Sequence, residues 1–292
     1  MKLIDLRAVG AAYRFVLDNP TPVLAAAGLY GVVFSVQSLL TAYAHAYAPG
    51  AAPGMILFMI AAFGAFVVGW ASLGRQALGL PQKGFHGLTL GGDEGRLAWA
   101  LFLVLLLLTI ILMTAGVAMA FMIAGLAFTD MDPGAPQPEG YVNLFELMGP
   151  GALAVSVVLV TVFVLFSLWL ITRLALTAPA TLNERAVRVL SIWPLSRARS
   201  IEITLTSLAS LAPGVLTLAV FNAICLALLG AGPVIAQSAA GEAGQLTVSP
   251  VLMLLISALY GAGKIALLAA PLIAALSALY HKYAAEGEIQ AD

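Results

Sequence analysis

Long apolar runs separated by short polar segments dominate this chain. A helix needs roughly 20 apolar residues to cross the ~30 Å hydrocarbon core of a bilayer. Six runs meet or approach that length, and we expect spans at about 23–45, 54–74, 96–128, 150–173, 207–236 and 250–281. The third and sixth runs are long enough to require tilt or projection beyond the core. The pattern predicts an all-α fold, a polytopic transmembrane helical bundle that forms a single integral membrane domain over residues 1–292.

Residues 1–19 follow a different pattern. Apolar side chains recur at helical spacing from Leu3 to Leu17, while Lys2, Arg7 and Arg14 lie elsewhere on the helical wheel. This spacing predicts an N-terminal amphipathic helix that lies in the membrane interface. The Asn-Pro-Thr-Pro segment at 19–22 ends it and begins the first span. Ala44-His45-Ala46 resembles a signal-peptide cleavage site, but we expect the first span to be retained.

The basic residues indicate the orientation of the spans. All lysines and arginines except Lys264 lie in segments 1–22, 75–96, 173–206 and 282–292. The intervening loops, at about 46–53, 129–149 and 237–249, contain none. Because lysine and arginine accumulate in cytoplasmic loops, we expect a multi-pass protein of the bacterial inner membrane with both termini in the cytoplasm.

The connection from Arg173 to Glu202, here called the elbow, holds the densest basic cluster. Pro179 and Pro194 interrupt it, and Asn183 is a candidate cap for a short helix between them. Basic groups near a membrane attract anionic lipid at about 1 kcal/mol each. The candidate lipid-headgroup residues are Arg173, Arg185, Arg188, Arg197 and Arg199. The alternative is that these arginines only determine topology.

Three polar residues fall within the expected spans. Lys264 lies in the sixth, about 21 Å from an entry near Pro250, Asn222 lies in the fifth and Gln37 in the first. Lys264 is a candidate to reach inner-leaflet phosphates, to contact Asn222, Gln37 or a helix carbonyl, or to bind a ligand. For the two amides, hydrogen bonds between helices are the alternative to an intramembrane polar site.

Composition excludes several classes. The chain is 62% hydrophobic and 9% charged, whereas soluble domains are about 25% charged. A net charge of -1 disfavours nucleic-acid binding. The single cysteine excludes an internal disulfide and a multi-cysteine zinc site. The histidines lack metal-ligand spacing and the acidic loop 129–149 lacks a calcium pattern, so we expect no metal and no cofactor.

No nucleophile elbow, Walker loop, zinc-protease motif or CxxC pair is present. We therefore expect no enzyme but a membrane module that binds lipids, anionic ones in particular, or partner proteins. A second copy of the chain and another membrane protein both stay open as partners. One alternative function is a small-solute or lipid transporter or channel, with Lys264 and Asn222 lining its cavity. The other is a membrane-embedded enzyme acting on lipid, for which Glu184 beside the elbow arginines is the candidate.

Two segments resemble known proteins. RLALTAPATLNE at 173–184, followed by SIWPLSR at 191–197, resembles the connection after the fourth span in six-span proteins of the glycerophosphoryl diester phosphodiesterase membrane-domain type. LGGDEGRL at 90–97 resembles a segment in an uncharacterised alphaproteobacterial integral membrane family of similar layout. The resemblance implies a six-span fold and a membrane setting. It implies no enzyme activity, since that family's chemistry resides in a catalytic domain that this sequence lacks, and Pro194 departs from its Trp-Leu run.

Overall fold

The computed structural model describes residues 3–47, 52–129, 148–197, 199–229 and 249–291. Within these residues the fold is all-helical, and six helices are long and apolar enough to cross a membrane. The predicted fold class is therefore confirmed, and the chain is a multi-pass membrane protein. The apolar residues of Val142–Met148 also predict a short interfacial helix, but this segment falls almost entirely outside the described residues.

The helical elements follow one another with short connections. They are α1 (Leu6–Asp18), α2 (Pro20–Tyr47), α3 (Ala52–Ala77), α4 (Gly92–Thr129), α5 (Pro150–Leu174), α6 (Thr177–Glu184), η3 (Leu190–Ile192), α7 (Trp193–Ser196), α8 (Ser200–Leu229), α9 (Pro250–Gly263), η5 (Lys264–Ala269) and α10 (Ala270–Ala291). The sixth span is one long helix made of α9, η5 and α10. Each expected span corresponds to one of these long helices. The expected start of the fifth span at 207 is later than the start of α8 at Ser200, because the polar residues in the first turns of α8 do not belong to the apolar run.

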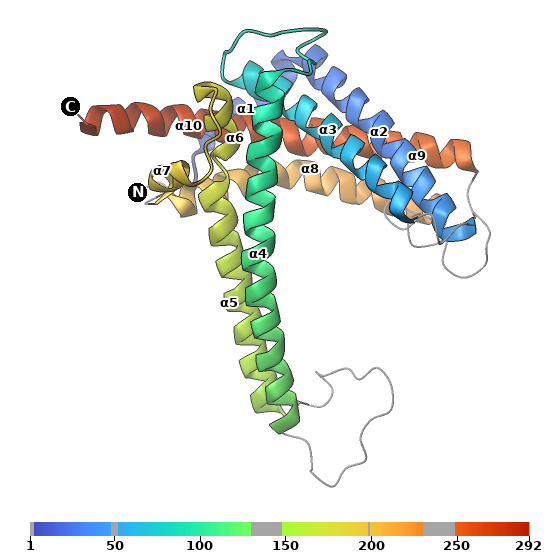
Figure 1. Cartoon of the computed structure of the whole chain (residues 1–292), viewed down its shortest axis with the longest axis vertical. Coiled ribbons are helices and arrows are strands. Elements are labelled where there is room, and N and C mark those ends of the chain that lie inside the picture. Colours follow the sequence, from blue (N-terminus) through green and yellow to red (C-terminus); the bar gives the residue numbers. More distant parts are fainter. Residues whose placement is uncertain (1–2, 48–51, 130–147, 198, 230–248, 292) are drawn as a thin grey trace.

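The spans fall into two groups (Figure 1). The first, here called the four-helix group, contains α2, α3, α8 and the long helix α9–η5–α10. The second is the α4–α5 hairpin, which diverges from this group, so that the two groups meet at only one end of the hairpin (Figure 1). Most of the α4 and α5 surface is exposed apolar side chain, which indicates a lipid-facing surface for a membrane helix.

A widened turn interrupts the sixth span at η5, a π-helix. The cause lies just beyond it, because Pro271 has no N–H to donate to the carbonyl of Leu267. The ladder shifts to the wider spacing, with the Ala270 N–H bonding to the Ile265 carbonyl. The Leu267 carbonyl lies against Gly214 of α8, where a Cβ atom would stand 2.0 Å from its oxygen. Glycine therefore permits this contact between α8 and η5.

Glycines also bring α2 and α9 together. A Cβ built on Gly31 would lie 2.7 Å from the carbonyl oxygen of Ala258, and one on Gly261 would lie 3.0 Å from the Phe34 side chain. Such close approach of helix backbones is common in membrane bundles, where packing replaces the hydrophobic driving force.

The predicted amphipathic helix at the N-terminus is present as α1. Asp5 caps it by accepting hydrogen bonds from the Arg7 and Ala8 N–H groups. Its buried Ala8 and Ala12 face the core, with Ala12 beside Ala275 of α10. The outer side exposes Leu6 and other apolar residues. These exposed residues are consistent with the expected position in the interface, which stays a prediction.

Candidate functional site

The elbow is folded rather than extended. It contains the short helices α6 and α7 and the 3-10 turn η3. Arg185 ends α6 in the left-handed conformation, with φ 52°, a position more often held by glycine. The expectation that Asn183 caps a helix after Pro179 is wrong. Pro179 lies inside α6 and Asn183 lies in its last turn, where its amide donates to the Tyr280 hydroxyl at 3.5 Å.

One side of the elbow belongs to the core. Every residue from Thr177 to Leu182 is buried, and Leu176 and Leu182 join a cluster with Leu97 and Leu279. The approach to α3 is close, because a Cβ on Gly74 would lie 2.5 Å from the Leu182 side chain. The elbow therefore packs against α3, α4 and α10, and only its other side is available for contacts.

The five elbow arginines occupy different environments. Arg173 is buried with its guanidinium over the rings of Trp169 and Trp193, at 5.2 and 5.5 Å from their centroids. Its Nε and Nη1 atoms have no hydrogen-bond partner. A guanidinium stacked on two indoles is held by cation–π attraction. Burial removes Arg173 from direct surface contact with a headgroup.

Two further arginines are engaged by acids. The Arg188 Nε donates to Glu184 at 2.7 Å. Arg199 pairs with Glu286 of α10, with its guanidinium 4.3 Å from the Tyr283 ring centroid. Arg185 and Arg197 are exposed and have no acidic partner among the described residues. Only these two cations are thus left uncompensated on the elbow surface.

Lys264 lies at the start of η5, half-buried between two aromatic rings. Its Nζ stands 4.2 Å from the Phe34 ring centroid and 4.8 Å from that of Tyr260. Neither Asn222 nor Gln37 bonds to it within the described chain. Lys264 therefore makes cation–π contacts, which the sequence did not indicate, with Tyr260 of α9 and with Phe34 of α2.

The two intramembrane amides are not brought to Lys264 by any hydrogen bond. Asn222 is half-buried on α8, and its Oδ1 atom is enclosed without a partner. Gln37 is half-buried on α2. The structure does not assemble the three candidate residues into one polar cluster.

A buried ion pair that sequence reasoning missed joins α3 to α4. Arg75 Nη1 donates to Glu94 at 2.5 Å, and Nη2 donates to the Gly87 carbonyl at 2.7 Å. The Thr89 hydroxyl also donates to Glu94, at 2.7 Å. Both charges are almost fully buried. The signal in the sequence was a lone arginine and a lone glutamate flanking the same short loop.

A second missed network joins the two ends of the chain. Lys282 of α10 donates to Asp5 at 2.8 Å and to Glu202 at 2.6 Å. The Asp5 N–H donates to the Thr206 hydroxyl of α8 at 3.0 Å. These bonds fasten α1 to both helices. All ion pairs of the described residues lie at the ends of the spans that carry the basic residues.

The Lys282 ammonium and the α1 N–H groups lower the pKa of the Asp5 carboxyl below its ordinary value of 3.8. At pH values near these two pKa values, the unfolded chain therefore binds more protons than the folded chain. The contribution of Asp5 to stability is fully present above about pH 4 and is lost as pH falls through the folded pKa. We expect thermal unfolding between pH 6 and 3 to show this loss. Asp5→Asn, which retains the helix cap, should flatten the acid limb, and an unchanged limb would contradict the assignment.

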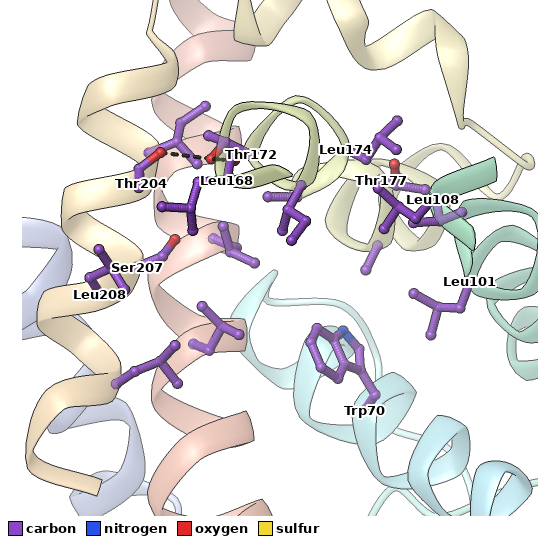
Figure 2. A pocket seen from close by; sticks show the side chains of 18 residues that line it. Trp70, Leu101, Leu108, Leu168, Thr172, Leu174, Thr177, Thr204, Ser207 and Leu208 are labelled. Atoms are coloured by element: carbon purple, nitrogen blue, oxygen red, sulfur yellow. Dashed lines mark hydrogen bonds between the residues drawn. The ribbon is translucent and has the colours of Figure 1, made fainter. Parts of the chain in front are cut away.

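An apolar cavity, here called the crevice, lies where the hairpin meets the four-helix group. Its volume is about 370 Å³, within the ~300–1,000 Å³ of small-molecule sites. Figure 2 shows Trp70 of α3, Leu101 and Leu108 of α4, Leu168 of α5 and Leu208 of α8 around it. Leu168 and Leu208 are partly exposed, so the crevice is open to its surroundings.

No family model, curated protein or solved structure matches this chain. The resemblance at residues 173–184, 191–197 and 90–97 accordingly stays a prediction. Among the residues that the structure describes, no three His, Cys, Asp or Glu side chains gather closely enough to hold a metal ion. The acidic loop 129–149 lies almost wholly outside that part of the chain.

Proposed function

We propose that this protein is a lipid-binding module of the inner membrane. It binds anionic headgroups through the exposed side of the elbow, opposite the side that packs in the core. The observation that carries the proposal is the pairing of uncompensated charge with exposed apolar surface. Arg185 and Arg197 are exposed and pair with no acid that the structure describes, and Val187 and Leu190 are exposed between them. Such a surface suits the interface, where apolar groups enter the acyl boundary and cations meet phosphates.

The elbow is also held firmly enough to present these groups. Its inner side is packed in the core, and Ser196 Oγ donates to the Arg173 carbonyl at 3.2 Å. Arg188 and Arg199 are engaged by Glu184 and Glu286, so they contribute less net charge. This function requires the elbow to lie in the cytoplasm, and the distribution of lysine and arginine supports that placement.

Replacing both Arg185 and Arg197 with glutamine should weaken binding of phosphatidylglycerol by about five-fold per arginine, the equivalent of about 1 kcal/mol per basic group. Native mass spectrometry of the protein titrated with phosphatidylglycerol or phosphatidylcholine measures this effect. Arg188→Gln with Glu184→Gln is the matched control and should have a smaller effect, because it removes both members of one ion pair and leaves the net charge unchanged. Equal losses in the two double variants, or no loss in either, would reject the elbow as the headgroup surface.

A further inference from the structure

The crevice is bounded on two sides by helices that the elbow connects. In its wall, Thr172 of α5 and Thr204 of α8 hydrogen-bond to each other at 2.7 Å (Figure 2). The elbow joins these two helices, and its Ser196 donates to the carbonyl of Arg173, the residue after Thr172, at 3.2 Å. Arg197, which follows Ser196, thus lies close to the wall of the crevice. Headgroup surface and apolar cavity are therefore neighbours.

The accessible wall of the crevice is almost entirely hydrocarbon. The Thr172 and Thr204 hydroxyls hydrogen-bond to each other, and the hydroxyl that accepts in this bond donates its own proton to a carbonyl of its helix, that of Leu168 or Ser200. The hydroxyl oxygens of Thr177 and Ser207 are enclosed. What remains at the surface of the cavity is mainly leucine, isoleucine, valine and the Trp70 ring. No charged side chain lines it. Such a wall favours an apolar occupant and offers little to a polar solute.

The surroundings of the crevice identify that occupant. Its walls belong to helices long and apolar enough to span a membrane, and Leu168, Ile171 and Leu208 are exposed at its edge. An open apolar cavity between membrane-spanning helices is in contact with lipid acyl chains rather than water. Filling it restores dispersion contacts that a void forfeits.

We propose that the crevice holds one acyl chain of an anionic phospholipid whose headgroup lies on the elbow. This inference rests on the proposed function for its headgroup half, but the apolar half stands on the crevice alone. The site would thus bind both parts of a lipid. The elbow would contact the charged headgroup at the interface, and the crevice between α4, α5 and α8 would hold the acyl chain.

Trp70 provides the test, because it lies in the crevice wall (Figure 2). Trp99→Phe, Trp169→Phe and Trp193→Phe together leave Trp70 as the single tryptophan, and the fluorescence of Trp70 is then recorded in vesicles. Two vesicle preparations are compared, both made mainly of phosphatidylcholine. One contains a minor fraction of phosphatidylglycerol brominated on its acyl chain, and the other contains the same fraction of brominated phosphatidylcholine. We expect the brominated anionic lipid to quench Trp70 about five-fold more effectively than the neutral one, as expected for a headgroup contribution near 1 kcal/mol.

Val104→Phe and Ala175→Leu each place added volume in the crevice and should reduce quenching by the anionic lipid to the level of the neutral lipid. Leu105→Phe is the matched control on α4, since Leu105 is exposed and does not line the crevice, and it should leave quenching unchanged. Two crevice variants are used so that misfolding of one does not remove the test.

The outcomes separate the two proposals. Quenching that is unaffected by both filling variants overturns the crevice site, even if Arg185→Gln with Arg197→Gln still lowers headgroup binding. Quenching that is lost on filling but equal for the two brominated lipids supports the acyl-chain site and overturns its anionic preference. Quenching that is both anionic-selective and lost on filling supports the whole inference.

Discussion

Replacing Gly214 with alanine should destabilise the protein by about 2 kcal/mol or more, the range expected for overpacking a close contact. The added Cβ would lie 2.0 Å from the Leu267 carbonyl oxygen and 2.7 Å from its carbon. These are backbone atoms of η5, so they cannot rotate away as a side chain would. The substitution must therefore separate α8 from the sixth span or distort the π-helix. Unfolding in mixed micelles by titration with dodecyl sulfate, followed by circular dichroism, measures the change.

Two glycines of α2 supply the control for this prediction. Gly31→Ala should also destabilise, because its Cβ would lie 2.7 Å from the Ala258 carbonyl oxygen. Gly28→Ala, one turn earlier, places its Cβ where nothing lies within 4 Å. It should be neutral or stabilising by up to about 1 kcal/mol, because alanine favours the helix. If Gly214→Ala behaves like Gly28→Ala, the close contact between α8 and η5 is wrong.

Replacing Arg75 with alanine should cost about 3–5 kcal/mol, the loss expected when one partner of a buried pair is removed. Glu94 would be left charged and nearly enclosed, with the Thr89 hydroxyl as its remaining side-chain donor. The Gly87 carbonyl would also lose its donor. Because this pair fixes the loop between α3 and α4, we expect increased proteolysis at residues 79–91 together with the lower stability.

Arg96→Ala is the matched control for Arg75→Ala. Arg96 pairs with Asp93 at 2.6 Å at the start of α4, but its side chain is 40% exposed. Exposed pairs contribute about 0–1 kcal/mol, so the control should be mild. The double variant Arg75→Leu with Glu94→Leu should lose less than the sum of its single changes, since neither charge is then left alone. Equal effects of Arg75→Ala and Arg96→Ala would contradict burial as the cause.

The spans could be predicted from the sequence because crossing a bilayer requires long apolar helices, and the runs leave few other assignments. The divergence of the α4–α5 hairpin could not. Its residues are apolar on nearly all sides, so the pattern contains no stripe that specifies a neighbouring helix. The π-helix could not be placed either, although Pro271 and Gly214 are the residues responsible. Their effect depends on two segments meeting that are far apart in the chain.

The elbow arginines show the same limit at the candidate site. Their density indicated an inner-face surface, but the environments of Arg173 and Arg199 depend on residues far away in the chain. Arg199 is neutralised by Glu286 and Arg173 is stacked on Trp193, and neither contact has a local signature. Arg185 and Arg197 differ from the others only because no such partner reaches them. The crevice is formed by six elements and has no sequence motif.

The bonds between Asp5 and Lys282 have a consequence for biosynthesis. Membrane helices are inserted in order as the chain leaves the ribosome, so α1 is made well before α10, the helix that binds it. Until α10 emerges, Asp5 has no ammonium to pair with, and the Ala8 and Ala12 side of α1 has no α10 to cover it. Docking of α1 is therefore a late step, which can occur only after the sixth span has been made. Ribosome-stalled chains that end before Lys282 should leave α1 accessible to protease.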